Sequence, residues 1–374
     1  MNNPPIPFGL QVVRQTGALP DHSDIPNCVI HNPMWIAQLI HWISIMDYLK
    51  NLISRLSLMP TDAHQQTIAR SNFAIPPQVT SKVLMITHNP KLQSQGGRTL
   101  KEYFGWNDSD TLAAGYISDV RECSFGYANF EIVERLVIDG FPIKADGFRY
   151  SEQSYLDAWR TGTFHNPDGV DYLQLVREFN LIERINRGQI DEVWLFGHPY
   201  GGYWESIMAG PGAFWCNAPP LAGTEQASKR FVIMGFNFER GVGEMLEDLG
   251  HRAESILSKV FDHSRGEASL FDRFIRYDQK NPGQAECGNV HFAPNSVRDY
   301  DWGNTRHVSS HCDNWYHFPD LAGNSRTVDC QEWGGGDIRA HHKWWLSHFP
   351  HISGESGGIS WNWWQYVVDP NQAA

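Results

Sequence analysis

The chain has 374 residues, of which 41% are hydrophobic, enough for one large core or two moderate ones. Its formal net charge is -12 and no block of Lys and Arg offsets it, which argues against a general nucleic-acid binder. Charged residues make up only 19%, while 33 Gly, 21 Pro, 15 Trp and 17 His are present. We therefore expect a loop-rich globular protein, and this composition favours an exported or extracellular enzyme or a saccharide-facing protein.

Residues 1–80 form a predicted N-terminal extension of loops and one helix. The opening residues, Asn2 to Pro5, are not the basic and then apolar stretch of a signal peptide. The apolar residues of 34–58 recur at helical spacing, but Asp47, Lys50 and Arg55 interrupt them. This stretch therefore predicts a packing helix and no clear membrane span, with an interfacial membrane helix as the alternative.

Residues 81–282 alternate predicted strands with predicted helices. We expect strands in four apolar or alternating runs, at 83–87, 129–139, 191–197 and 231–235. We expect helices where apolar residues recur three and four apart, at 110–122, 170–187 and 241–260. This alternation predicts an α/β core with a mainly parallel sheet flanked by helices.

Residues 283–374 differ in character from this core. Regular periodicity fades, and the segment holds eight Trp and eight His. We expect a short strand that ends in a turn at 288–295, and a helix at 337–348. A loop-rich segment this long inside a compact protein is commonly a functional cover. We therefore expect it to pack on the core as part of one integrated domain and to cover a site.

The six cysteines are widely spaced and include no C-x-x-C pair, which argues against a zinc ribbon. They are compatible with a disulfide between Cys312 and Cys330 in an oxidising compartment, or with six buried thiols.

The helix expected after residue 240 carries a polar stripe. Residues three, four and seven apart share one face of a helix, so Glu244, Glu247, His251 and Glu254 lie on one side. The stripe is opposite the apolar face, so an ordinary solvated helix surface is one interpretation. A metal or proton-transfer site is the other, because His251-x-x-Glu254 has the spacing of a ligand pair.

A later histidine, His291, completes a candidate ligand set. A divalent metal, zinc or calcium, held by His251, Glu254 and His291 would keep an open position for water. In these three positions alone, the order of ligands resembles that of metallocarboxypeptidases. Asp299 and Asp301 offer further oxygen ligands nearby.

Three predicted strands deliver polar residues at their carboxyl ends, where open α/β sheets bind ligands. Glu205, flanked by aromatic residues just past one strand, is the candidate general base, and Glu247 is its alternative. The expected substrate-binding residues are His198, Tyr203, Trp204, Asn237, Asp301 and Trp302.

These features favour a metal-dependent hydrolase that acts on a peptide or glycan in a pocket at the carboxyl ends of the strands. Two alternatives stay open. One is a metal-free glycoside hydrolase that pairs Glu205 with Glu244, Glu254 or Asp301. The other is a non-catalytic module that binds carbohydrate or protein. The sequence does not set the oligomeric state.

Overall fold

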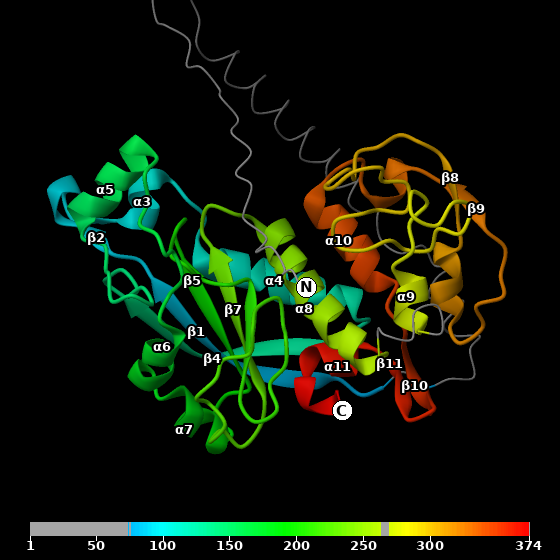
Figure 1. Ribbon diagram of the computed structural model, residues 1–374, viewed down its shortest axis with the longest axis horizontal. Coiled ribbons are helices and arrows are strands. Elements are labelled where there is room, and N and C mark those ends of the chain that lie inside the picture. The colour runs from blue at the N-terminus through cyan, green and yellow to red at the C-terminus, as the bar shows by residue number, and fades with distance from the viewer. Residues whose placement is uncertain (1–73, 75, 263–268, 374) are drawn as a thin grey trace, which may run out of the picture. The chain divides into compact units, whose positions relative to one another are not determined.

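The computed structural model describes residues 74, 76–262 and 269–373, which belong to the unit Ser71–Ala374. At its centre is a five-stranded sheet in the order β4-β1-β5-β7-β6 (Figure 1). Its strands are β1 Val79–His88, β4 Ala128–Ile138, β5 Glu192–Gly197, β6 Ser206–Ala209 and β7 Phe231–Asn237. Strands β4, β1, β5 and β7 are parallel, and β6 runs antiparallel to β7. The predicted mixed α/β class with a mostly parallel sheet is confirmed.

Helices cover both faces of this sheet, which explains the nearly continuous apolar character of its central strands. Successive side chains of a strand point to opposite faces. Val83 and Met85 of β1 therefore join the core beneath α4 Ser109–Cys123 and α8 Val242–Val260. Leu84 and Ile86 join the core on the other face, beneath α6 Tyr172–Glu178 and α7 Leu181–Asn186.

The single helix predicted at 170–187 is wrong, because the chain forms α6 and α7 there. Asn180 separates them with a left-handed backbone conformation, at a φ of 51°. This conformation ends a right-handed helix, and Asn tolerates it better than most residues. The apolar periodicity continues across the break because Leu175 of α6 and Leu181 of α7 enter the same core.

A buried ion pair fixes the rotation of α8 on the sheet. The guanidinium of Arg252 donates to both carboxylate oxygens of Glu192 in β5, at 3.2 and 3.0 Å. The indole N–H of Trp194 also donates to Glu192, at 2.6 Å. One residue along a helix turns the side chain by about 100°. Because Arg252 points toward the sheet, the side chain of the adjacent His251 leaves α8 in a different direction, about 100° away around the helix axis.

Residues 283–373 hold short elements linked by long loops. The strand predicted at 288–295 is wrong, because this segment is a turn in which Asn289 and Phe292 exchange backbone hydrogen bonds at 2.8 and 3.2 Å. The elements formed are the hairpins β8 Val308–Ser310 with β9 Arg326–Val328 and β10 His351–Ser356 with β11 Ile359–Asn362, the helices α10 Ile338–Ser347 and α11 Trp364–Val368, and the short 3-10 helices Cys312–His317, Cys330–Trp333 and Pro370–Gln372.

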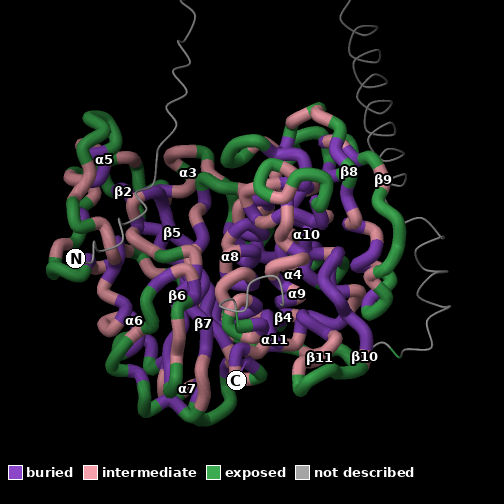
Figure 2. Tube along the Cα trace, turned by 45° about the vertical axis from the view of Figure 1, so that its right-hand side comes forward, coloured by how far each residue is buried: buried purple, intermediate pink, exposed green. Residues whose placement is uncertain are grey.

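The tryptophans of this segment pack into the core that also contains α4 and α8. Trp315, Trp333, Trp345, Trp363 and Trp364 are buried there, and α10 lies beside α8 (Figure 2). Residues 283–373 therefore share a core with the sheet. The domain boundaries at 80 and 282 stay predictions. The cysteines at 123, 216, 287, 312 and 330 are free and buried, so Cys312 and Cys330 form no disulfide.

The remaining elements lie in the connections. They are β2 Lys91–Leu92, the 3-10 helix Gln93–Gln95, β3 Arg98–Thr99, α3 Leu100–Phe104, α5 Glu152–Thr161 and α9 Leu270–Phe274. Within the part of the chain that the structure describes, each helix is too short or too polar to cross a bilayer. The helix predicted at 34–58 lies outside the described residues.

Candidate metal centre

The polar stripe of α8 is partly buried, so it is not an ordinary solvated helix surface. Glu247 is only 9% exposed, and the side chains of His251 and Glu254 are 16% and 27% exposed. The Val290 backbone N–H donates to Glu254 Oε1 at 3.2 Å, and His291 Nε2 lies 3.3 Å from Glu247 Oε1. Glu244 lies apart from this group, because it accepts the backbone N–H of Gly241 at the start of α8.

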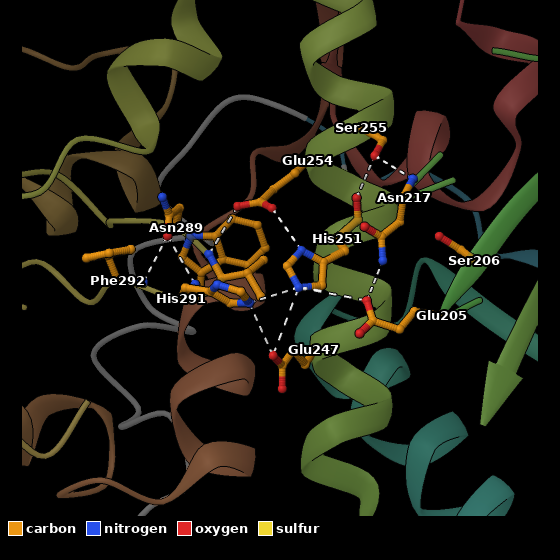
Figure 3. Close-up of polar contacts among 12 residues, drawn as sticks. Glu205, Ser206, Asn217, Glu247, His251, Glu254, Ser255, Asn289, His291 and Phe292 are labelled. Atoms are coloured by element: carbon orange, nitrogen blue, oxygen red, sulfur yellow. Dashed lines mark hydrogen bonds and ion pairs between the residues drawn. The ribbon is translucent and has the colours of Figure 1, made fainter. Parts of the chain in front are cut away.

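Two imidazole rings face each other at the centre of this region (Figure 3). The Nε2 atoms of His251 and His291 are 3.0 Å apart. Each Nδ1 atom lies beside a carboxylate, Glu254 Oε2 at 3.2 Å for His251 and Asp299 Oδ1 at 3.0 Å for His291. A carboxylate at Nδ1 holds a proton there, so the neutral form of such a ring has its lone pair on Nε2. We infer this tautomer from the contacts.

Glu247 and Glu205 complete the cluster around the two Nε2 atoms. Glu247 Oε1 is 3.3 Å from Nε2 of His291 and 4.0 Å from Nε2 of His251. Glu205 Oε2 is 3.9 Å from Nε2 of His251. Zinc bonds of about 2.0–2.1 Å in a tetrahedron place neighbouring ligand atoms about 3.4 Å apart. The spacing of Glu247, His251 and His291 therefore suits a single ion.

The charges of this cluster shift the pKa values of its members. Burial disfavours the charged form of His251, but the hydrogen bond to Glu254 and the nearby charges of Glu254, Glu205 and Glu247 outweigh it and raise its pKa to about 9. Burial also disfavours the Glu247 carboxylate, yet the contact with His291 holds its pKa below the usual range. The pKa of Glu205 is raised, because burial and the charge of Glu247 outweigh the attraction of His251.

Glu205 reaches the cluster from the residue just before β6. Its backbone carbonyl accepts the N–H of Gly235 in β7 at 3.1 Å, and its Oε2 accepts a hydrogen bond from the side-chain amide of Asn217. Only glycine fits at position 235, because a Cβ atom there would lie 2.4 Å from the Trp204 carbonyl oxygen. The close approach of β6 to β7 thus sets the position of Glu205.

His291 is held by contacts from two helices. Glu254 of α8 binds the Val290 N–H, and the indole N–H of Trp345 in α10 donates to the Gly288 carbonyl at 2.9 Å. Gly288 has a φ of 73°, and a Cβ atom there would collide with the Phe292 carbonyl oxygen. The turn that carries His291 is therefore fixed against both α8 and α10.

Tyr300 belongs to the site although the sequence did not single it out. Its hydroxyl oxygen lies 3.1 Å from Nε2 of His291, and its ring centroid lies 4.4 Å from that of His291. The residue is half-exposed and has a left-handed backbone conformation, at a φ of 56°. The only available signal was its place between Asp299 and Asp301, which does not distinguish a site residue from a loop residue. Asn217 was missed because it too lies in a loop, where the sequence does not distinguish a site residue from a loop residue.

The structure brings together five of the predicted site residues and places the other six elsewhere in the fold. Glu205, Glu247, His251, Glu254 and His291 form the cluster (Figure 3), with Glu247 beside the two Nε2 atoms where the sequence favoured Glu254. The carboxylate of Asp301 accepts from Val297 N–H and Asn304 within its own loop. Trp302 is buried and stacks on His341 at 5.0 Å.

The other predicted substrate-binding residues lie at or near strand ends. Buried His198 packs edge-on against the Tyr155 ring at 4.7 Å. The Tyr203 hydroxyl contacts His88 Nδ1 at 2.6 Å, and Asn237 accepts the Glu239 backbone N–H at 3.0 Å. Trp204 is 48% exposed. Their assignment to substrate binding stays a prediction.

A second group of potential ligands among the described residues is Cys312, Asp313 and His348. Both carboxylate oxygens of Asp313 already accept from the Arg326 guanidinium, at 2.6 and 2.9 Å. Burial also raises the pKa of the Cys312 thiol to about 12, which opposes the thiolate that binds metals. This group is therefore the weaker candidate.

Comparison of the chain with protein-family models, with curated proteins and with solved structures finds no match.

Proposed function

We propose that the protein is a metal-dependent hydrolase in which Glu247, His251 and His291 bind one divalent cation. The contact between the two Nε2 atoms, 3.0 Å apart, is the observation that carries this proposal. Two lone pairs at that distance repel each other unless a proton or a cation lies between them. Two imidazoles and a carboxylate suit zinc better than calcium, which prefers oxygen ligands.

Both histidines have the supporting contacts that are typical of metal ligands. A metal-binding imidazole commonly gives its other N–H to a carboxylate, which orients the ring and strengthens the nitrogen as a donor. Glu254 fills this role for His251, and Asp299 fills it for His291. Two such pairs that converge on one point are hard to explain as a surface ion-pair network.

The other side chains have the positions that hydrolysis requires. A bound zinc ion would supply Lewis acidity, which lowers the pKa of a coordinated water. Glu205 is suited to accept the proton of that water, because its pKa is raised and its side chain is 42% exposed beside His251. The hydroxyl of Tyr300 is placed to donate to an oxyanion that develops next to His291.

Residues 289–300 act as a cover for this site in our proposal. Support comes from the burial of Glu247 and from the hydrogen bonds of Val290 with Glu254 of α8 and His342 of α10. Glu205 is the residue just before β6, and its carbonyl bonds to Gly235 in the carboxyl half of β7. This position supports a site near the carboxyl ends of the strands.

A metal-free glycoside hydrolase fits these contacts less well, because its second carboxylate must be free to act. Glu244 is engaged by the start of α8, Glu254 by His251 and Val290, and Asp301 by its own loop. A purely binding module gives no reason for the raised pKa of Glu205 beside two carboxylate-bound imidazoles.

Hydrolysis of p-nitrophenyl acetate by the full chain, loaded with zinc, tests the proposal. We expect activity that chelation abolishes and zinc restores, with Glu205→Gln lowering the rate about 10²–10⁴-fold while zinc stays bound. His165→Ala is the matched control for His251→Ala, since His165 also pairs with a carboxylate, Asp146 at 2.8 Å, but has no second imidazole beside it. Activity that survives exhaustive chelation, or equal loss in the two His variants, would contradict the proposal.

A further inference from the structure

A groove of about 450 Å³ follows the second half of α8, on the side of the metal cluster where Glu254 lies. Glu254, which holds His251, forms one end of its lining. The side chains along the groove are Phe214 and Trp215 from the loop after β6, and Glu254, Ser255, Ser258 and Lys259 from α8. The groove therefore adjoins the cluster through Glu254.

The wall formed by Trp215 is held rigidly in place. Trp215 is 58% exposed, while the adjacent Cys216 is fully buried. The Ser206 hydroxyl donates to the Cys216 carbonyl at 3.2 Å, and the Asn217 N–H donates to Ser255 Oγ at 3.1 Å. The loop that presents the indole thus also positions Asn217 against Glu205. An exposed indole on an anchored loop gives a ligand in the groove a flat apolar face to pack on.

The sheet edge nearest to the cluster is not available to a peptide. Extended peptides commonly bind by pairing their backbone with an open strand edge. Strand β6 is this edge, but the Met208 carbonyl accepts the Leu221 N–H at 2.9 Å, and the Gly210 N–H just beyond the strand donates to Thr224 Oγ1 at 2.8 Å. The groove instead offers the aromatic face of Trp215 and the hydroxyl of Ser258, while the Ser255 hydroxyl is engaged by Asn217 and the His251 carbonyl. The C–H face of a sugar ring packs on an indole, and its hydroxyls bond to such polar groups.

We propose that the groove binds a saccharide chain and that the enzyme removes an acyl group from it. This inference rests on the proposed function. A bound metal would supply activation of a water toward a carbonyl carbon, whereas cleavage of an acetal carbon needs two free carboxylates, and Glu254 and Asp301 are engaged. An acyl substituent is therefore the bond in a saccharide that this cluster suits.

The reaction is a simple hydrolysis. The oxygen of water bonds to the acyl carbon, and the bond from that carbon to the sugar nitrogen or oxygen breaks. Glu205 takes the proton from the water and returns it to the departing amine or alkoxide. The products are a carboxylate and a free amino or hydroxyl group on the sugar.

Acetate release from a tetramer of N-acetylglucosamine and from an acetylated xylose tetramer tests this inference and distinguishes amide from ester substrates. We expect Trp215→Ala to weaken binding of the saccharide at least tenfold at unchanged zinc content. Trp159→Ala is the matched control, because Trp159 is 37% exposed but lies in α5 against Phe104. We expect no change in that variant.

Three outcomes separate this inference from the proposed function. Zinc binding and ester hydrolysis without acetate release from either sugar would overturn the saccharide assignment and leave the hydrolase intact. Equal binding by the Trp215 and Trp159 variants would overturn the assignment of the groove. Neither zinc binding nor ester hydrolysis by the unaltered chain would contradict the proposed function itself.

Discussion

Glu254 joins His251 on α8 to the turn that carries His291 through two hydrogen bonds, and replacing it by Gln removes one of them. Glu254 Oε2 accepts from His251 Nδ1, and Oε1 accepts from the Val290 N–H, each at 3.2 Å. A Gln side chain has one oxygen acceptor, and its amide nitrogen is a donor. In either orientation, the imidazole or the backbone N–H next to His291 therefore loses its partner.

The expected cost follows from the burial of the carboxylates. Loss of a supporting carboxylate weakens metal binding about 10–100-fold, or about 1.4–2.7 kcal/mol. Glu254→Gln belongs near the upper end, because the Glu254 side chain is only 27% exposed and binds both halves of the site. Asp299→Asn belongs near the lower end, because the Asp299 side chain is 56% exposed.

Titration of zinc against a chelator of known affinity measures both effects at fixed pH. Glu244→Gln is the control, since Glu244 is on the same helix but bonds only to Gly241 at its start. We expect that variant to bind zinc within about threefold of the unaltered chain. Zinc affinity that is unchanged in Glu254→Gln, or reduced equally in Glu244→Gln, would refute the role given to Glu254.

Three further predictions follow from the fold and the site. Gly250→Ala puts a Cβ atom 2.6 Å from Val290 Cγ2, so it should lower the free energy of unfolding by about 1–3 kcal/mol and weaken zinc binding by displacing His291. Adding Val290→Ala should recover both, as measured by denaturant unfolding and zinc titration, and no recovery would contradict the packing argument. Burial lowers the pKa of His198 to about 3, so below its unfolded pKa of about 6.5 only the unfolded chain gains a proton there, and stability falls by about 1.4 kcal/mol per pH unit down to the folded pKa. His198→Gln should flatten the pH profile of unfolding by that slope, and a parallel profile would be the contrary result. Tyr300→Phe should lower turnover about 10²–10³-fold at unchanged zinc content, and an unchanged turnover number would exclude the hydroxyl as an oxyanion donor.

The sequence predicted the elements whose patterns are long and regular. The central strands are covered on both faces and read as apolar runs, and the 3.6-residue period placed Glu247, His251 and Glu254 on one side of α8. Strand β6 was missed because its four residues carry no usable period. The break at Asn180 was missed because the helices on its two sides bury the same face.

The composition of the cluster was only partly predictable, because it depends on the orientation of rings and on loops. Glu247 and Glu254 are both one helical turn from His251, and only the rotation of its imidazole decides which carboxylate meets Nδ1 and which faces Nε2. Asn217 and Tyr300 reach the site through loop conformations that include positive φ values of 52° and 56°. Such conformations follow from tertiary contacts and have no sequence period.

X-ray absorption at the zinc edge of the loaded full chain tests the central claim most directly, because it reports the atoms bound to the metal. Our account predicts two imidazole nitrogens with carboxylate or water oxygens, at about 2.0–2.1 Å, and no sulfur. A sulfur ligand at about 2.3 Å would place the metal at a cysteine such as Cys312, next to Asp313 and His348, and would contradict the assignment to Glu247, His251 and His291.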